Sequence, residues 1–455
     1  MPKSTYASVV LDVDPETHLL PVEPQSDTAF RILVLGDFSG RANRAEPPPD
    51  RLTPHLIDRD NFDDVLARIR PALHLGPPGR ALALSFRELE DFHPDRIYAQ
   101  DVFTKLRATG RLPAPPAPAP VAPPPDLPAF TSGSLLDSVL ETTEGRPAPR
   151  PRDPLRDFVE RAVAPHTAPR QDPRIAADSA AAAGEAGKLM RAVLHHADFQ
   201  NLEAAWRALH WLVRRLETGP LLKVYALDIS KAGLAAKMPQ LRRLLVDDAS
   251  GNPWTLAVAN FAFAQTANDV AMLAELASIM RAAGTVLLAE ADPSDADSQE
   301  AARLWQALRH APAATSVGLA LPRFLLRLPY GAKTDTVESF PFEEMPGAPE
   351  HREYLWGNPA FACACLLGQA FSRDGWDLRP GTHTEIAGLP LHVYESNGEP
   401  QLKPCAEVLL TESAADSILA EGCMPLVSVK DRDAARLIRF QSIAQPLAPL
   451  SGAWT

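Results

Sequence analysis

The pattern of apolar and polar positions predicts two segments of helices and strands, one at each end of the chain. From residue 188 to 218, apolar residues recur at alternating steps of three and four, which predicts one long amphipathic helix. Strands are predicted after it at 222–227, 254–263, 285–289, 317–321, 389–394, 407–410 and 424–429, and helices at 268–283, 359–371 and 413–421, with a further helix capped by Ser230. Strands that alternate with helices favour an α/β fold with a largely parallel sheet.

The first segment has a more mixed pattern. Residues 6–13 alternate weakly, which suggests an edge strand, whereas residues 30–35 are apolar enough for a buried strand. A helix at 62–69, a strand at 81–86 and a second helix that runs through residues 102 to 106 are also expected. We therefore predict an α/β protein with α+β character in its N-terminal part.

A proline-rich stretch separates the two segments. Nine prolines lie among the sixteen residues from 113 to 128, with almost no charge. Such a tract is stiff and extended at about 3.1 Å per residue, so it could hold two domains roughly 50 Å apart. We expect a first domain at 1–112, a linker with short amphipathic helices at 113–187, a second domain at 188–445 and a tail at 446–455.

Composition narrows the function classes. The 45 Lys and Arg against 57 Asp and Glu leave a formal charge of −12, so a nucleic-acid partner is disfavoured. The N-terminus shows no leader pattern, and no window reaches the roughly 18 apolar residues of a membrane span. The chain is therefore expected to be cytoplasmic and not inserted in a membrane. Cys363 and Cys365 have no second ligand pair, and no glycine-rich phosphate loop follows a strand, so no metal or cofactor is expected.

The most unusual chemistry lies at residues 316–331. Arg323 and Arg327 interrupt an otherwise apolar stretch, and a buried guanidinium needs a partner. Glu343 and Glu344 follow, and they are candidate partners in a structural ion-pair cluster. An anion-binding catalytic site of a hydrolase-like enzyme is the alternative. No nucleophile, metal set or cofactor loop accompanies these residues, so no catalytic residues are assigned and an enzyme is disfavoured.

Several motifs resemble known proteins. The segments at 316–331, 340–344 and 354–358, with the helix segment LHHADFQNLEAAWRALHWLV, resemble the large subunit of the type VI secretion contractile sheath (TssC, VipB or ImpC). The strand and turn at 30–41, with the element at 86–95, resemble the small subunit (TssB, VipA or ImpB). The resemblance implies two sheath-type domains fused on one chain, the second shortened at its C-terminal end.

This resemblance also implies a function. A sheath protein is structural, and it assembles by packing and strand pairing with other sheath subunits around an inner tube. The shortened second domain leaves an alternative open, which is an accessory or baseplate-proximal protein that binds authentic sheath subunits without polymerising. The implied partners are other sheath subunits, an inner tube protein and a ClpV-like unfoldase.

Two stretches are candidate binding segments. Residues 134–140 combine an S-x-x-D capping pattern with one apolar face, and they could dock on the protein's own surface or in a partner's groove. The resemblance implies that an unfoldase recognises this helix. Its candidate residues are Ser134, Leu135, Leu136, Asp137, Val139 and Leu140, and those of a candidate strand-pairing edge are Tyr6, Ser8, Val10 and Asp12.

Overall fold

A computed structural model describes most of the chain. It covers residue 24 and residues 27–76, 82–100, 103, 173–248, 252–294, 296–396 and 398–454. Two compact units are present, one made of Met1–Phe103 with Gly187–Thr455 and the other of Thr104–Ala186. The fold described below is that of the first unit.

A nine-stranded sheet forms the centre of this unit, in the order β11-β15-β14-β8-β7-β6-β1-β5-β2. Its strands are β1 (Phe30–Gly36), β2 (His55–Ile57), β5 (Leu222–Asp228), β6 (Leu256–Phe263), β7 (Val286–Ala291), β8 (Val317–Leu321), β11 (Glu385–Ala387), β14 (Met424–Ser428) and β15 (Ala434–Leu437). The strands from β14 to β5 run in parallel, and β2, β15 and β11 add antiparallel strands at the two edges. The predicted α/β class with a largely parallel sheet is confirmed.

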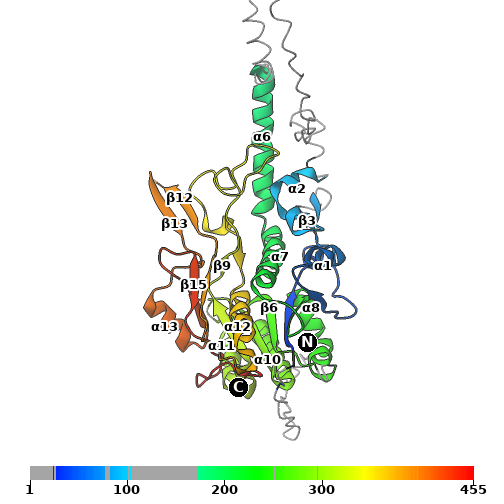
Figure 1. The fold of residues 1–455 in the computed structure, drawn as a ribbon, viewed down its shortest axis with the longest axis vertical. Helices are drawn as coiled ribbons and strands as arrows, with labels where there is room; N and C mark the ends of the chain where they lie inside the picture. The colour runs from blue at the N-terminus through cyan, green and yellow to red at the C-terminus, as the bar shows by residue number, and fades with distance from the viewer. Residues whose placement is uncertain are drawn as a thin grey trace, which may run out of the picture. The chain divides into compact units, whose positions relative to one another are not determined.

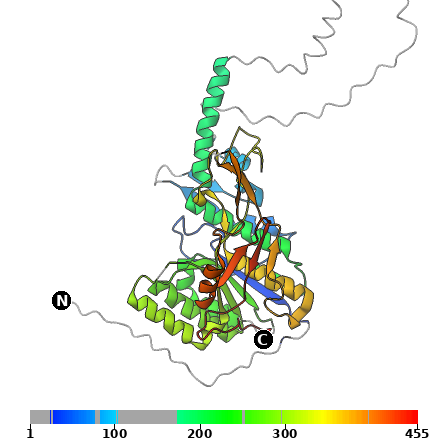
Figure 2. The ribbon, with the colours of Figure 1, turned by 90° about the vertical axis from the view of Figure 1, so that its left-hand side faces the viewer.

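The N-terminal strand β1 lies inside this sheet (Figure 2). It pairs with β5 along its whole length, from Phe30 opposite Leu222 to Gly36 opposite Asp228, and with β6 on its other side. Its apolar side chains are fully buried on both faces of the sheet, and a strand of this character needs both neighbours and both faces covered. The expected separation into two folded domains therefore differs from the structure, in which both segments share one sheet. The exact boundaries of the segments stay a prediction.

Helices pack on both faces of the sheet, α8 (Lys231–Ala236), α9 (Met238–Arg242), α10 (Ala267–Ala283) and α11 (Gln299–His310) on one and α12 (Pro359–Asp374) on the other (Figure 1). The other helices are α1 (Phe62–Ile69), α2 (Pro94–Ala99), α6 (Pro173–Leu194), of which residues 187–194 belong to this unit, α7 (Ala197–Arg215) and α13 (Glu412–Ala420). Alternate side chains of the sheet, such as Leu33 and Leu35, join α8 to α11 in one large apolar core. Side chains at the intervening strand positions lie on the opposite face, against α12. There the ring centroid of Phe30 is 4.8 Å from that of Phe371.

Three small antiparallel strand pairs and several short helical turns complete the unit. Two of these pairs are hairpins, β3 (Ala72–Leu75) with β4 (Leu82–Ser85) and β12 (His392–Ser396) with β13 (Glu399–Lys403). The third is formed by β9 (Phe324–Leu325) and β10 (Trp356–Gly357), which are far apart in the chain. The turns are η1 (Leu89–Phe92), η2 (Arg243–Asp247), η3 (Pro312–Ser316), η4 (His351–Glu353) and η5 (Gly375–Asp377).

Helix α7 connects the N-terminal segment to the rest of the unit. The indole Nε1 of Trp206 donates a buried 2.8 Å hydrogen bond to the carbonyl oxygen of Phe38, directly after β1. The ring of Phe199 contacts Phe86 and Phe92, both at 6.0 Å between ring centroids. The Asp37 carboxylate accepts hydrogen bonds from the amides of Arg41 and Ala42, so this side chain closes the turn after β1.

Two local predictions are wrong. The helix expected as one continuous element over 188–218 is broken into α6 and α7, because His196 adopts an extended backbone and its side chain accepts a hydrogen bond from the amide of Asp198 as an N-cap. The strand expected at 407–410 is not formed, although Glu407 bonds through its amide to the carbonyl oxygen of Arg323.

The candidate segments at 6–12 and 134–140 lie outside the described residues. No helix within the described ranges is long and apolar enough to cross a membrane.

The position of β1 predicts how two separate pieces behave. Residues 173–455 expressed alone would expose the edges of β5 and β6 and should be poorly soluble. Co-expression with residues 1–112 should restore solubility, and the two pieces should co-purify on a tag placed on either one. Val34→Asp, at a fully buried position of β1, should abolish co-purification. Leu56→Asp, at a half-exposed position of the edge strand β2, should not. Independent purification of two soluble pieces would contradict the shared sheet.

Candidate functional site

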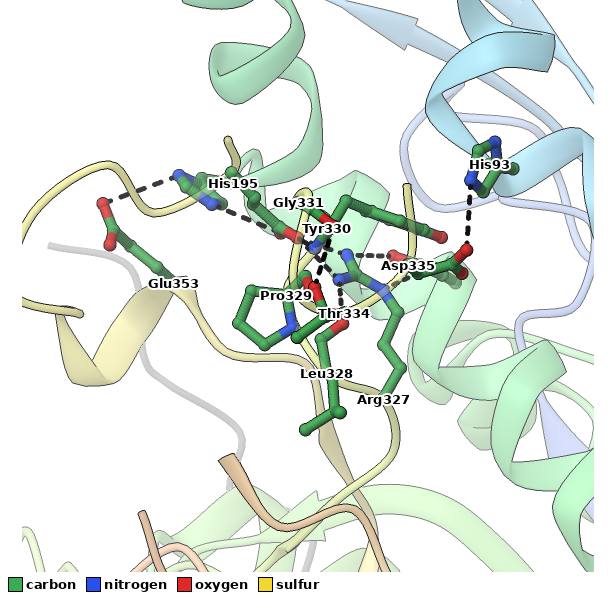
Figure 3. Close-up of polar contacts among 12 residues, drawn as sticks. His93, His195, Arg327, Leu328, Pro329, Tyr330, Gly331, Thr334, Asp335 and Glu353 are labelled. Atoms are coloured by element: carbon green, nitrogen blue, oxygen red, sulfur yellow. Dashed lines mark hydrogen bonds and ion pairs between the residues drawn. The ribbon is translucent and has the colours of Figure 1, made fainter. Parts of the chain in front are cut away.

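Arg327 is the centre of a buried cluster of charges (Figure 3). It follows β9, and its guanidinium bonds to two carboxylates. Its Nε donates to Glu203 Oε1 and its Nη1 to Glu344 Oε2, each at 2.8 Å. The side chains of Glu203 and Glu344 are fully buried, and that of Arg327 is 10% exposed. Both acids are thus bridged by one guanidinium away from solvent.

A second arginine completes the charge balance. Arg207 lies one turn after Glu203 on α7, and its Nε donates to Glu203 Oε1 at 2.6 Å. Its Nη2 donates to the hydroxyl of Tyr330 at 2.7 Å, and the guanidinium of Arg327 lies 4.2 Å from the centroid of the Tyr330 ring. The amide of Tyr330 donates to Glu344 Oε2 at 2.8 Å. Two positive and two negative charges therefore neutralise each other, and every carboxylate oxygen accepts a hydrogen bond.

The cluster also holds together separate parts of the chain. His195, at the break between α6 and α7, has its two ring nitrogens 3.4 Å from Glu344 and 3.7 Å from Glu353. On the other side, the ring of His93 from the N-terminal segment packs edge-on against Tyr330 and lies 3.7 Å from Asp335. Figure 3 shows both histidines on opposite sides of the loop that carries Arg327.

The electrostatics follow from burial and these contacts. Burial alone would raise the pKa of Glu344, but the charge of Arg327 and hydrogen bonds from His195, Arg327 and the Tyr330 amide lower this pKa to about 2. Burial alone would lower the pKa of Arg327, but the charges of Glu203 and Glu344 raise it well above its usual value. The charged forms of both partners are therefore the stable ones inside the fold.

The four predicted cluster residues do not all meet. Arg327 and Glu344 are bonded to each other, whereas Arg323 bonds to Glu407, with 2.8 Å between Nε and Oε2. Glu343 bonds to neither arginine, and its Oε1 accepts from the amide of Ala332 at 3.0 Å. The Glu343 carboxylate packs against Gly331. A Cβ atom on residue 331 would lie 2.1 Å from Glu343 Oε2, so no larger residue fits there without movement of Glu343. The structure therefore brings Arg327 and Glu344 together and places Arg323 and Glu343 with other partners.

Sequence reasoning missed Glu203, Arg207 and Glu407. A signal for the first two exists, because Glu203 lies on the same helix face as the apolar residues Phe199 and Trp206, and Arg207 follows it by four positions. A charge within an apolar stripe indicates a buried pair. Glu407 is 84 positions from Arg323, and no local pattern could have joined them.

The closed cluster and the shared sheet are features of a protein whose parts are fixed to one another by packing. Matches to family models agree with this class. The VipB model, described as EvpB/VC_A0108, tail sheath N-terminal domain, matches residues 184–444, which is more than half of the chain. The chain belongs to this tail-sheath family. A second model, T6SS_VipA, described as Type VI secretion system, VipA, VC_A0107 or Hcp2, matches residues 13–107. The chain thus joins a TssB-like segment to a TssC-like segment, as predicted.

The chain is also similar to one curated relative and to chains of two solved structures. It is 32% identical over 289 residues to the type VI secretion system sheath protein TssC1 of Pseudomonas aeruginosa PAO1, covering 56% of this chain and 58% of the relative's length. Chains of the anti-feeding prophage baseplate and of its contracted helical sheath are 14% identical, with TM-scores of 0.30 and 0.29. The matches cover 53% and 54% of this chain and 50% and 53% of those chains. At these TM-scores the two structures carry no argument about function.

Removal of the central guanidinium should strongly destabilise the fold. Arg327→Met leaves Glu203 and Glu344 buried with fewer partners, so the free energy of unfolding should fall by about 3–5 kcal/mol. Urea denaturation followed by circular dichroism measures this change. Arg352→Met is the matched control, because Arg352 forms a 2.8 Å ion pair with Glu350 but is 83% exposed, and it should cause no measurable change. Equal effects of the two substitutions would contradict the central role of Arg327.

The pKa of Glu344 predicts acid sensitivity. In the folded protein it is lowered to about 2 from the ordinary 4.5, so the stability that the ionised carboxylate contributes is complete above the ordinary value and is lost as pH falls below it. The free energy of unfolding should therefore fall more steeply between about pH 5 and pH 3 in the native protein than in Glu344→Gln. Glu275→Gln, on the exposed face of α10, should keep the native slope. Identical slopes in all three proteins would exclude this contribution.

Proposed function

We propose that the chain is a structural component of a type VI secretion contractile sheath. It would assemble with other sheath subunits by packing and strand pairing around an inner tube, in the cytoplasm. The observation that carries the proposal is the way the two family segments combine. The segment matched by the VipA model contributes β1 and β2, and the segment matched by the VipB model contributes the strands on both sides of β1.

This combination supports a building block in which both sheath segments are present in one chain. The seven-residue register between β1 and β5 fixes their relative position, and the bond from Trp206 to the Phe38 carbonyl fixes the turn that follows. A subunit made in this way would need no separate small subunit to complete its sheet. We infer that assembly then depends on surfaces outside this shared core.

We also infer that the protein works without catalysis. Arg327 is enclosed by Glu203 and Glu344, and Tyr330 is fully buried beside them. Arg323, the more exposed of the two arginines, is held by Glu407. These arrangements leave the guanidiniums occupied by protein carboxylates, which favours positioning of chain segments over binding of a reacting anion. The inner tube and a ClpV-like unfoldase remain proposed partners on the basis of the family.

Electron microscopy of negatively stained samples tests this function. The purified chain should form regular tubes, either alone or together with the TssB-like and TssC-like pair from the same cell. The pair without this chain is the control, and it sets the reference diameter and length of the tubes. Decoration or shortening of those tubes by a chain that forms none itself would favour the accessory role. No binding and no tubes in either sample would overturn the sheath proposal.

A further inference from the structure

A cleft runs along the carboxyl edge of the parallel strands. Its larger part, of about 890 Å³, lies beyond β6, β7 and β8 and is bounded by residues of α11 and α13. Its smaller part, of about 360 Å³, lies beyond β1, β5 and β6. The two parts share Ala262, Glu290 and Arg323 in their linings, so they adjoin at these residues.

The strand order makes this edge a natural place for a ligand. The order β5-β1-β6-β7-β8 has the form 2-1-3-4-5. From β1 the chain first adds β5 on one side and then adds β6, β7 and β8 on the other, so the strand order reverses between β1 and β6. In open α/β sheets, ligands bind outside the carboxyl ends of the strands at such a reversal. The smaller part of the cleft lies there, with Asp37 and Gly40 after β1 and Asn260 on β6 among its lining residues.

Glu290 is the unusual charge of the cleft. It lies near the end of β7, its side chain is only 17% exposed, and the nearest cation is Arg323, with 3.9 Å between Arg323 Nε and Glu290 Oε1. The Arg323 guanidinium is already committed to Glu407. Among the described residues, none donates a hydrogen bond to the Glu290 carboxylate. Burial raises the pKa of Glu290 to about 7, as expected for a carboxylate without sufficient partners.

The remaining charges leave the larger part of the cleft acidic. Asp292, Glu407 and Glu421 line it together with Glu290, against the guanidiniums of Arg309 and Arg323. Both guanidiniums already donate to protein acceptors, since Nε of Arg309 bonds to the carbonyl oxygen of Ile443. A cationic group is therefore the complementary ligand for Glu290, whose one cation at ion-pair distance in the described structure, Arg323, is shared with Glu407.

Apolar and hydrogen-bonding groups extend the cleft beyond this charge. Val408 and Leu410 line its larger part, and Val408 and Leu409 are 49% and 67% exposed. The amides of residues 408–410 make no hydrogen bond within the described structure, although this is the segment whose sequence predicts a strand. In the smaller part, the side-chain amides of Asn201 and Asn260 also make no hydrogen bond to described residues. Free peptide and side-chain amides beside exposed apolar groups are suited to an extended peptide.

We propose that this cleft binds an extended, apolar segment of a neighbouring sheath subunit that places a lysine or arginine against Glu290. The cation would pair with Glu290, and apolar side chains of the segment would pack on Val408 and Leu410. Asn201 and Asn260 would bond to the segment's peptide groups. This inference rests on the proposed function, because it takes the partner to be another sheath subunit.

A peptide array tests the proposal directly. Overlapping 12-residue peptides that cover this chain and the TssC1 sheath protein of Pseudomonas aeruginosa are probed with the labelled full-length chain. The bound peptides should combine apolar residues with a lysine or arginine. In solution, replacement of that basic residue by glutamine should weaken the Kd by about tenfold or more. The absence of any bound peptide, or binding that does not depend on a basic residue, would overturn the proposal.

Variants identify the cleft as the binding place. Glu290→Lys should abolish peptide binding, and Glu290→Gln should weaken it about tenfold, with circular dichroism verifying that each variant is folded. The matched control Glu275→Lys, on the exposed face of α10, should bind as the native chain does. Unchanged binding by both Glu290 variants would refute the assignment to this cleft.

The pH dependence gives an independent readout. The charged groups that act on Glu290 are Arg323, Glu407 and Asp292. Binding of the best peptide should weaken as pH falls from about 8 to about 6, because protonation removes the negative charge of Glu290. Glu290→Gln should show a much flatter profile, and equal profiles would count against the proposal. Tubes formed by a chain that binds no peptide would refute the cleft alone, whereas peptide binding without tubes would refute the polymerising sheath role.

Discussion

The fold depends on the neutralisation of two buried carboxylates by Arg327. A charge removed from water is costly unless a partner and enough hydrogen bonds compensate it. Glu203 from α7 and Glu344 from the loop region meet this requirement only when Arg327 lies between them. The cluster therefore permits one arrangement of α7, the segment after β9 and the joint at His195. Its net neutrality explains how such charges remain in an interior that is otherwise apolar.

The shared sheet is the second constraint. β1 has buried side chains on both faces and parallel neighbours on both sides, so the N-terminal segment cannot leave without opening the centre of the sheet. The bond from Trp206 to the Phe38 carbonyl and the contacts of His93 with the Arg327 loop bind the same segment to α7 and the charged cluster. Two segments that family models recognise separately thus share one sheet and one set of packing contacts.

The carboxyl edge of the sheet has the opposite character. Arg327 is enclosed, but Glu290 lacks a close partner and faces a cleft beside exposed apolar side chains. In a protein of a sheath family, surfaces left incompletely satisfied in the single chain are the natural places for contacts between subunits. The distinction between Arg323 and Arg327, which look alike in sequence, is the distinction between these two environments.

Local patterns in the sequence were sufficient to predict most of the elements and the family resemblance. Apolar periodicity predicted several elements to within a few residues of their observed bounds, because the spacing of apolar side chains reflects which face of an element is buried. These elements are β1, α1, β5, α10, β8 and α12. The sequence could also indicate that Arg327 needs an acid and that Glu344 could supply it. Three features could be seen only in the folded chain: β1 inserts between β5 and β6, Arg323 pairs with Glu407, and the amides of residues 408–410 make no hydrogen bond within the described structure. These outcomes depend on contacts between residues far apart in the chain, and pairing of charges or strands across such separations leaves no periodic trace in a single sequence.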